Sequence, residues 1–136
     1  MSDVKQAIFG VHADALVLRQ QRLDLIASNI ANTDTPGFKA QDIDFAAALR
    51  AASGRAALPD EQAAAINKTL DVRRDVELAG RDARFFRPAL QPSLDGNTVD
   101  SQLEHAAFAK AALEYRTSLG FIESKVRGLL LAITGQ

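Results

Sequence analysis

The sequence predicts a mainly α-helical protein in which long N- and C-terminal helices pack as an antiparallel, coiled-coil-like hairpin. An irregular middle segment can hold a short helix and short β elements. Two apolar patterns of helical period, one at each end of the 136-residue chain, carry this prediction, together with a proline-containing turn after the first pattern. We expect a single unit, residues 1–136, made of a helix and turn (1–45), a variable middle (46–95) and a second helix (96–136).

The first apolar pattern runs from Asp3 to about Ala31 and predicts a helix roughly 45 Å long. Its apolar residues form two lines that together cover an arc of about 200°, roughly twice the stripe of a helix that packs on one core. Arg22 interrupts the first line. The lines contain Val4, Ile8, Val11, Ala15, Leu18 and Leu25, and Phe9, Leu16, Leu23 and Ile30. A hairpin would use only part of this arc, so we expect the remaining apolar surface to support assembly.

A turn should follow this helix, because the side chains of residues 32–35 can bond nearby backbone groups and compete with the helix. Thr35 is disfavoured in the α region by the proline after it. Pro36 and Gly37 suit the two central positions of a type II turn, the second of which has a positive φ. We expect the chain to leave this turn extended, along Phe38.

The middle segment is less regular. Residues 43–52 predict a short helix that ends at Ser53-Gly54. Residues 55–80 have a weak pattern, for which a short strand pair and a ragged helix are both possible. Residues 85–92 should be extended, because Pro88 and Pro92 exclude a helix interior.

The second long helix should follow a turn at Asp95-Gly96 and run to about Ile133. Asn97 or Thr98 can cap it, and Asp100 favours its first turn through the helix dipole. Its apolar residues keep a strict four-three spacing for more than three heptads, which is typical of a coiled coil. We call this set the C-terminal seam: Phe108, Ala112, Tyr115, Leu119, Ile122, Val126, Leu129 and Ile133.

Composition and charge exclude several kinds of partner. The net charge of −1 provides no basic field for nucleic acid, and the absence of cysteine excludes disulfides and thiol chemistry. No basic segment followed by an apolar run begins the chain, so we expect no cleaved signal peptide. The longest apolar run near the end, residues 129–133, is too short to insert in a bilayer. By themselves these features predict a soluble cytoplasmic protein.

No catalytic, cofactor or metal site is expected. His12 and His105 lack an i,i+4 partner of the metalloprotease type, so we interpret them as packing or surface residues. Asp42 and Asp44 are spaced for one face of a strand, where two carboxylates could do acid-base chemistry. We favour a polar edge after the turn.

Asn29 and Asn32 have two interpretations that both stay open. They can help to end the helix, or Asn29, which continues the first apolar line, can bond polar groups of a neighbouring helix and set its register.

The run Ser-Asn-Ile-Ala-Asn-Thr-Asp-Thr-Pro-Gly-Phe-Lys, residues 28–39, resembles the S-N-I-A-N-x-x-T-P-G-[YF]-[KR] signature of the flagellar basal-body rod and hook family. Residues 41–45 and 91–100, together with the short chain, are similar to the proximal rod members of that family. The sequence departs from the family at Gln102-Leu103, where a more charged first turn is expected. The resemblance points to these assembly residues: Ser28, Asn29, Asn32, Thr35, Pro36, Gly37, Phe38, Asp95, Gly96 and Asn97.

The resemblance implies a structural subunit that packs with copies of itself and other rod proteins. Such a rod joins the inner-membrane ring to the distal rod, transmits torque and encloses the export channel. Its other implied partners are the ring and rod-to-ring adaptor proteins and the flagellar type III export apparatus, which would deliver the chain to the periplasm-spanning rod without a cleaved signal. Neither nucleic acid nor membrane insertion is implied.

Two other classes of function are alternatives. A cytoplasmic coiled-coil adaptor or export chaperone would account for the C-terminal seam, but it gives no reason for the asparagine-rich turn with Pro36-Gly37. A small enzyme would need a convergent polar pocket, which these residues do not provide.

Overall fold

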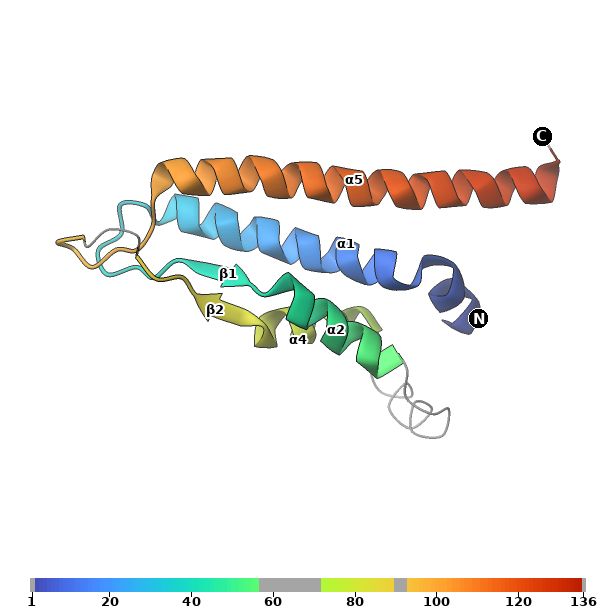
Figure 1. Cartoon of the computed structure of the whole chain (residues 1–136), viewed down its shortest axis with the longest axis horizontal. Coiled ribbons are helices and arrows are strands. Elements are labelled where there is room, and N and C mark those ends of the chain that lie inside the picture. The colour runs from blue at the N-terminus through green and yellow to red at the C-terminus, as the bar shows by residue number, and fades with distance from the viewer. Residues whose placement is uncertain (1, 57–71, 90–92, 136) are drawn as a thin grey trace.

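Two long helices lie side by side along the molecule, and a smaller layer of two helices and two short strands lies against the first of them (Figure 1). The computed structural model describes residues 2–56, 72–89 and 93–135. The elements in chain order are α1 (Ser2–Ala31), β1 (Gln41–Ile43), α2 (Phe45–Ala56), α4 (Val72–Asp82), β2 (Arg84–Phe86) and α5 (Ser101–Thr134). This architecture confirms the predicted helical hairpin with a short helix and short β elements between its two long helices.

The two long helices run antiparallel in a constant register. Each step forward along α5 is matched by an equal step backward along α1. Three side-chain pairs mark this register: Asn29 with Glu104 (3.1 Å), Arg19 with Glu114 (3.4 Å) and His12 with Phe121 (6.2 Å between ring centroids). The hairpin is therefore held by polar and aromatic contacts spread along its length.

The hydrophobic core lies on the other side of α1, between this helix and the α2–α4 layer. Leu18 and Leu25 of α1 are buried there, and α4 comes so close that a Cβ at Gly80 would overlap the side chain of Gln21. The other buried members of the core are Ile43, Ala48, Ala52, Val76 and Ala79. Since α1 packs on α5 as well as on this layer, much of its wide apolar arc is used inside the molecule. The part of the arc that the hairpin leaves over is therefore covered largely by the α2–α4 layer of the same chain.

The predicted middle helix is present, but its limits differ from the prediction. Ile43 belongs to β1, and the Asp44 carboxylate caps α2 by accepting a hydrogen bond from the Ala47 amide (3.0 Å). The helix continues through Ser53-Gly54 to Ala56. A glycine inside a helix destabilises it by only about 1 kcal/mol. The burial of Ala48 and Ala52 of α2 in the core offsets this cost.

The strands pair antiparallel, with Gln41 opposite Phe86 and Ile43 opposite Arg84. The predicted extension from residue 85 is thus confirmed in β2, whereas residues 90–92 lie outside the described part. Of the two alternatives for residues 55–80, the helix is found from Val72 onward as α4. Residues 57–71 are not described.

The predicted N-terminal helix is interrupted at Gly10, whose φ of 30° and ψ of −126° are not helical. The beginning of α1 consequently bends away from the end of α5 (Figure 1). From Glu123 to Gly135 every residue of α5 and its cap is exposed. Among the described helices, none is both long and apolar enough to cross a membrane.

Candidate assembly surfaces

Residues 32–40 and 93–98 form a compact junction at the end of the hairpin where α1 stops and α5 starts. Asn97 is at its centre: its buried side-chain amide donates to the carbonyl oxygens of residues 32, 33 and 35, at 3.0, 2.7 and 3.1 Å. These carbonyls lie just after the last turn of α1, where helix geometry no longer provides donors. Asn97 therefore ties the two segments together.

Neither Asn97 nor Thr98 caps α5, contrary to the expectation. Asp100 is the cap, because its carboxylate accepts hydrogen bonds from the amides of Gln102 (3.0 Å) and Leu103 (3.2 Å). The side-chain amide of Asn97 instead donates to the carbonyls of residues 32, 33 and 35, and its Oδ1 accepts a hydrogen bond from the Val99 amide (2.8 Å).

The turn at Gly37 has the predicted geometry and also forms part of the junction. Gly37 has a φ of 73°, and the Phe38 amide donates to the Thr35 carbonyl (3.3 Å). The Gly37 amide donates in turn to the Asp95 carbonyl (2.8 Å). A Cβ at Gly96 would lie 3.9 Å from the Gly37 Cα, so the two glycine turns meet closely.

The remaining signature residues lie on the outside of the junction. Ser28 and Pro36 are exposed, and the Ser28 carbonyl accepts from the Asn32 side chain (2.8 Å). The Thr35 hydroxyl donates to Oδ1 of Asn32 (3.1 Å). Asn32 therefore helps to end α1, as the first interpretation of the asparagines predicts.

Asn29 follows the second interpretation. It is 1% exposed, and its Nδ2 donates to the Gln41 carbonyl (2.8 Å) and to Oε2 of Glu104 on α5 (3.1 Å). Its Oδ1 accepts from the Gln41 amide (3.1 Å). Glu104 is 0% exposed and forms an ion pair with Nη2 of Arg87 (2.7 Å). We call Asn29, Arg87 and Glu104 the buried polar cluster.

The buried polar cluster joins α1, α5 and the segment after β2, and sequence reasoning missed two of its three members. Glu104 is the first of three buried residues of α5, with Ala111 and Ser118, at intervals of one heptad. This spacing of small or polar residues is the signal that could have indicated the face of α5 that packs on α1.

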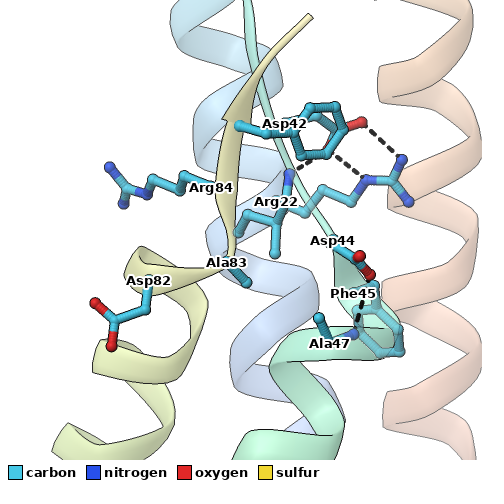
Figure 2. A pocket seen from close by; sticks show the side chains of 10 residues that line it. Arg22, Asp42, Asp44, Phe45, Ala47, Asp82, Ala83 and Arg84 are labelled. Carbon is cyan, nitrogen blue, oxygen red and sulfur yellow. Dashed lines mark hydrogen bonds and ion pairs between the residues drawn. The ribbon is translucent and has the colours of Figure 1, made fainter.

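Arg22 interrupts the first apolar line because it makes a two-pronged ion pair with Asp42 of β1 (Figure 2). The Nε–Oδ1 and Nη2–Oδ2 distances are both 2.9 Å. The hydrogen bond to Asp42 raises the pKa of Arg22. Asp42 is thus a buried ion-pair partner rather than a polar edge, whereas Asp44 is exposed and caps α2.

These side chains line an open hollow of about 690 Å³ beside β1 and β2 (Figure 2). The Asp42 carboxylate forms an ion pair with Arg22, and the Asp44 carboxylate accepts a hydrogen bond from the Ala47 amide at the start of α2. The two carboxylates do not converge on a common point that could do acid-base chemistry. Within the described ranges, His, Asp and Glu side chains form no group of three or more that could hold a metal ion.

The C-terminal seam does not form the face of α5 that packs on α1. Tyr115 and Ile122 lie at its edge, half-buried, while Leu119, Val126 and Leu129 are exposed. Leu103, Leu113, Phe121 and Leu131, which lie off the seam, are exposed as well. The buried residues of the packed face are Glu104, Ala111 and Ser118, and the larger apolar side chains of α5 lie at its edge or on the surface.

An antiparallel pair of long helices, a rigid junction at one end and outward-facing apolar side chains define a helical structural protein. Residues 9–39 match the family described as flagella basal body rod protein. Similar proteins are the flagellar basal body rod proteins FlgB of Cereibacter sphaeroides (strain ATCC 17029), 44% identical over 93% of this chain and 94% of the relative, and of Aeromonas hydrophila, 42% identical over 94% and 93%. FlgB of Escherichia coli (strain K12) is 36% identical over 96% of this chain and 95% of its own. The chain therefore belongs to the flagellar basal body rod protein family.

This membership confirms the resemblance seen at residues 28–39 and gives the chain a structural role in the basal body rod of the flagellum. The family is one of structural rod components rather than of enzymes.

Proposed function

We propose that the chain is a subunit of the proximal rod that assembles with copies of itself and with other axial proteins, and that the rod links the inner-membrane ring to the distal rod and transmits torque for motility. The observation that supports this best is the outward orientation of the C-terminal seam. Leu119 remains exposed where α5 packs on α1, and Val126 and Leu129 are exposed in the part of α5 from which α1 bends away.

Burying these side chains between subunits would supply the driving force for assembly. Each large aliphatic side chain contributes about 1.5–3 kcal/mol when it is fully buried. Association costs an estimated 4–15 kcal/mol in lost freedom of motion. Leu119, Val126 and Leu129 are 38–39% exposed, so burying what remains of the three contributes only about 2–3.5 kcal/mol per contact. Several such contacts, repeated around a tube, are therefore needed to offset the cost of association.

Torque transmission requires helices that do not slide along each other. The buried polar cluster supports this part of the proposal, because a slip of α5 along α1 would separate Glu104 from both Asn29 and Arg87. A buried carboxylate without partners is costly, by several kcal/mol. The hairpin should consequently move as one body under load.

The proposal includes further partners: the inner-membrane ring, the rod-to-ring adaptor proteins and the flagellar type III export apparatus. It places the protein in the periplasm-spanning rod, to which it is exported without a cleaved signal peptide. The relatives named flagellar basal body rod protein FlgB support this assignment. The assembly residues proposed for these contacts are those of the junction and of the C-terminal seam.

The test compares apolar seam positions of α5 with a charged position of the same helix. Leu119→Asp and Val126→Asp should abolish recovery with basal bodies, since a carboxylate at a packed apolar site costs several kcal/mol. Both positions are exposed in the single chain, so the circular dichroism of the purified variants should stay close to that of the parent. Glu123→Ala, at an exposed charged position of the same helix, is the matched control and should be recovered as well as the parent.

Equal recovery of Glu123→Ala and Val126→Asp would show that the seam is not the assembly surface. Cell fractionation gives a separate answer. A parent protein that stays in the cytoplasm and is absent from basal bodies would contradict the proposal and favour the adaptor or chaperone.

A further inference from the structure

β2 pairs with another strand on one side only, and its other side lies at the margin of the small layer, away from α1 (Figure 1). The Arg87 amide donates toward β1, to the Ala40 carbonyl (2.8 Å), and the ladder is antiparallel. Because the backbone groups of successive residues point to alternate sides of such a strand, those of Arg84 and Phe86 point away from β1. Within the described ranges they have no hydrogen-bond partner. β2 therefore has a free edge.

The opposite edge of this two-stranded sheet is closed by α1. Asn29 bonds both backbone groups of Gln41: its Oδ1 accepts from the amide (3.1 Å) and its Nδ2 donates to the carbonyl (2.8 Å). In contrast, all three residues of β2 are exposed, and its aromatic side chains, Phe85 and Phe86, are 46% and 67% exposed. A free strand edge that also presents apolar side chains is suited to the addition of another strand.

An open hollow of about 690 Å³ lies beside this edge (Figure 2). Asp42 lies opposite Phe85 in the ladder, so both side chains are on the same face of the sheet. Both residues line the hollow, together with Phe45 at the start of α2. The Arg84 side chain points away from the Arg22–Asp42 pair (Figure 2). A strand added at β2 would consequently direct its residue opposite Phe85 into the hollow.

We infer that β2 accepts an extended segment of another protein as a third, antiparallel strand. Main-chain hydrogen bonds to Arg84 and Phe86 hold the segment, and its side chains select it. The residue opposite Phe85 is a large apolar one, because the hollow has room for it and Phe45 and Phe85 offer apolar contact. The residue opposite Phe86 is β-branched or aromatic, since such cross-strand pairs stabilise a sheet.

A second copy of the chain fits this edge less well than a different protein. Two copies that paired β2 with β2 would form a two-fold contact, which closes on a pair and turns one copy round. Subunits that point the same way along a tube cannot form this contact, so the choice of occupant rests on the proposed function. The three residues of β2 are also few, because a stable interface uses about 20–30 residues a side. A segment that other contacts of the rod hold nearby needs little affinity of its own.

Titration of the purified protein with a synthetic peptide, followed by nuclear magnetic resonance, tests the contact directly. The probe has the core Val-Leu-Val between threonines, which places valine opposite Phe86 and leucine opposite Phe85. In the control peptide proline replaces both valines, because these carry the amides that would bond β2. At saturating probe the amides of Arg84 and Phe86 should exchange about tenfold more slowly. Those of Asp44 and Arg87, which already bond within the sheet, should change by less than about twofold.

A substitution tests the same edge in the assembled rod. Phe86→Pro removes the amide that points to the free edge and leaves the amides that bond β1 in place. Phe86→Val keeps this amide and is the matched control. Recovery with basal bodies should fall about tenfold or more for Phe86→Pro and stay within about twofold of the parent for Phe86→Val. The circular dichroism of both purified variants should match that of the parent, and the peptide titration decides the contact however well Phe86→Pro folds.

Several results would overturn the inference. Equal slowing of exchange by both peptides, or none by the probe, would show that no strand adds at β2. Equal recovery of the two variants, with unchanged circular dichroism, would show that the rod does not use this edge. A dimer of the purified parent that Phe86→Pro abolishes would make a second copy the occupant. Absence of the parent from basal bodies contradicts the proposed function alone, and the titration still decides the strand contact.

Discussion

Replacing Asn29 by alanine should destabilise the protein far more than an ordinary surface substitution. Asn29 makes hydrogen bonds to the amide and the carbonyl of Gln41 and to the carboxylate of Glu104. Leaving a buried donor or acceptor without a partner costs about 1–3 kcal/mol. Two orphaned backbone groups and a weakened carboxylate contact add up to about 3–5 kcal/mol, a large part of the roughly 5–15 kcal/mol that stabilises a typical domain.

Urea denaturation followed by circular dichroism measures this loss. With a slope of about 1–3 kcal/mol per molar urea, the midpoint should fall by at least about 1 M. Asn32→Ala is the matched control, because the Asn32 side chain bonds only the Ser28 carbonyl and the Thr35 hydroxyl near the surface. It should cost about 1 kcal/mol or less.

A double-mutant cycle then separates the contact between helices from the contact to Gln41. Combining Asn29→Ala with Glu104→Gln should show a coupling free energy of about 0.5–3 kcal/mol. Additive effects, or equal destabilisation by Asn29→Ala and Asn32→Ala, would refute the view that the buried polar cluster fixes the register of the hairpin.

Three further predictions concern other parts of the chain. Gly37→Val should lower the melting temperature by roughly 4–8 °C and impair motility. The space around a Cβ at this position is open, so the cost comes from the positive φ, which strains a β-branched residue by about 1–2 kcal/mol. An unchanged melting temperature would contradict this prediction. Arg22→Met should lower the free energy of unfolding, measured by urea denaturation, by about 2 kcal/mol, because it removes the ion-pair partner of Asp42. The loss is limited because Arg22 is partly exposed. A decrease below about 0.5 kcal/mol would contradict the pairing. The hydrogen bond from Ser93 lowers the pKa of Asp95 below its ordinary 3.8, so its support of the turn is present above that value and lost as the pH falls through the lowered pKa. The protection of the Asn97 amide, measured relative to the intrinsic exchange rate at each pH, should fall only in that acid range. Loss of protection that begins near neutral pH would show that another group titrates.

Local features of this chain could be predicted from the sequence because their causes lie within a few residues. The helical periods at the two ends give α1 and α5, and the proline-glycine pair gives the turn with positive φ at Gly37. The signature at residues 28–39 likewise identifies the rod protein family, because it is a contiguous motif. The end of α2 was predicted wrongly because packing against the core overrides the low helix propensity of Gly54.

Only the tertiary structure decided which side chains meet. Asn97 was expected as a possible helix cap, but it binds carbonyls more than sixty residues away. Glu104, which no sequence pattern singles out, is buried between Asn29 and Arg87. The spacing of apolar residues also did not show which face of α5 packs on α1, since the buried residues of that face are Glu104, Ala111 and Ser118, which a hydrophobicity pattern ranks low. The helical spacing of apolar residues thus determined the two long helices, and the proline-glycine pair determined the turn. The packing of segments that are distant in the sequence determined which polar groups are buried and which apolar side chains stay exposed.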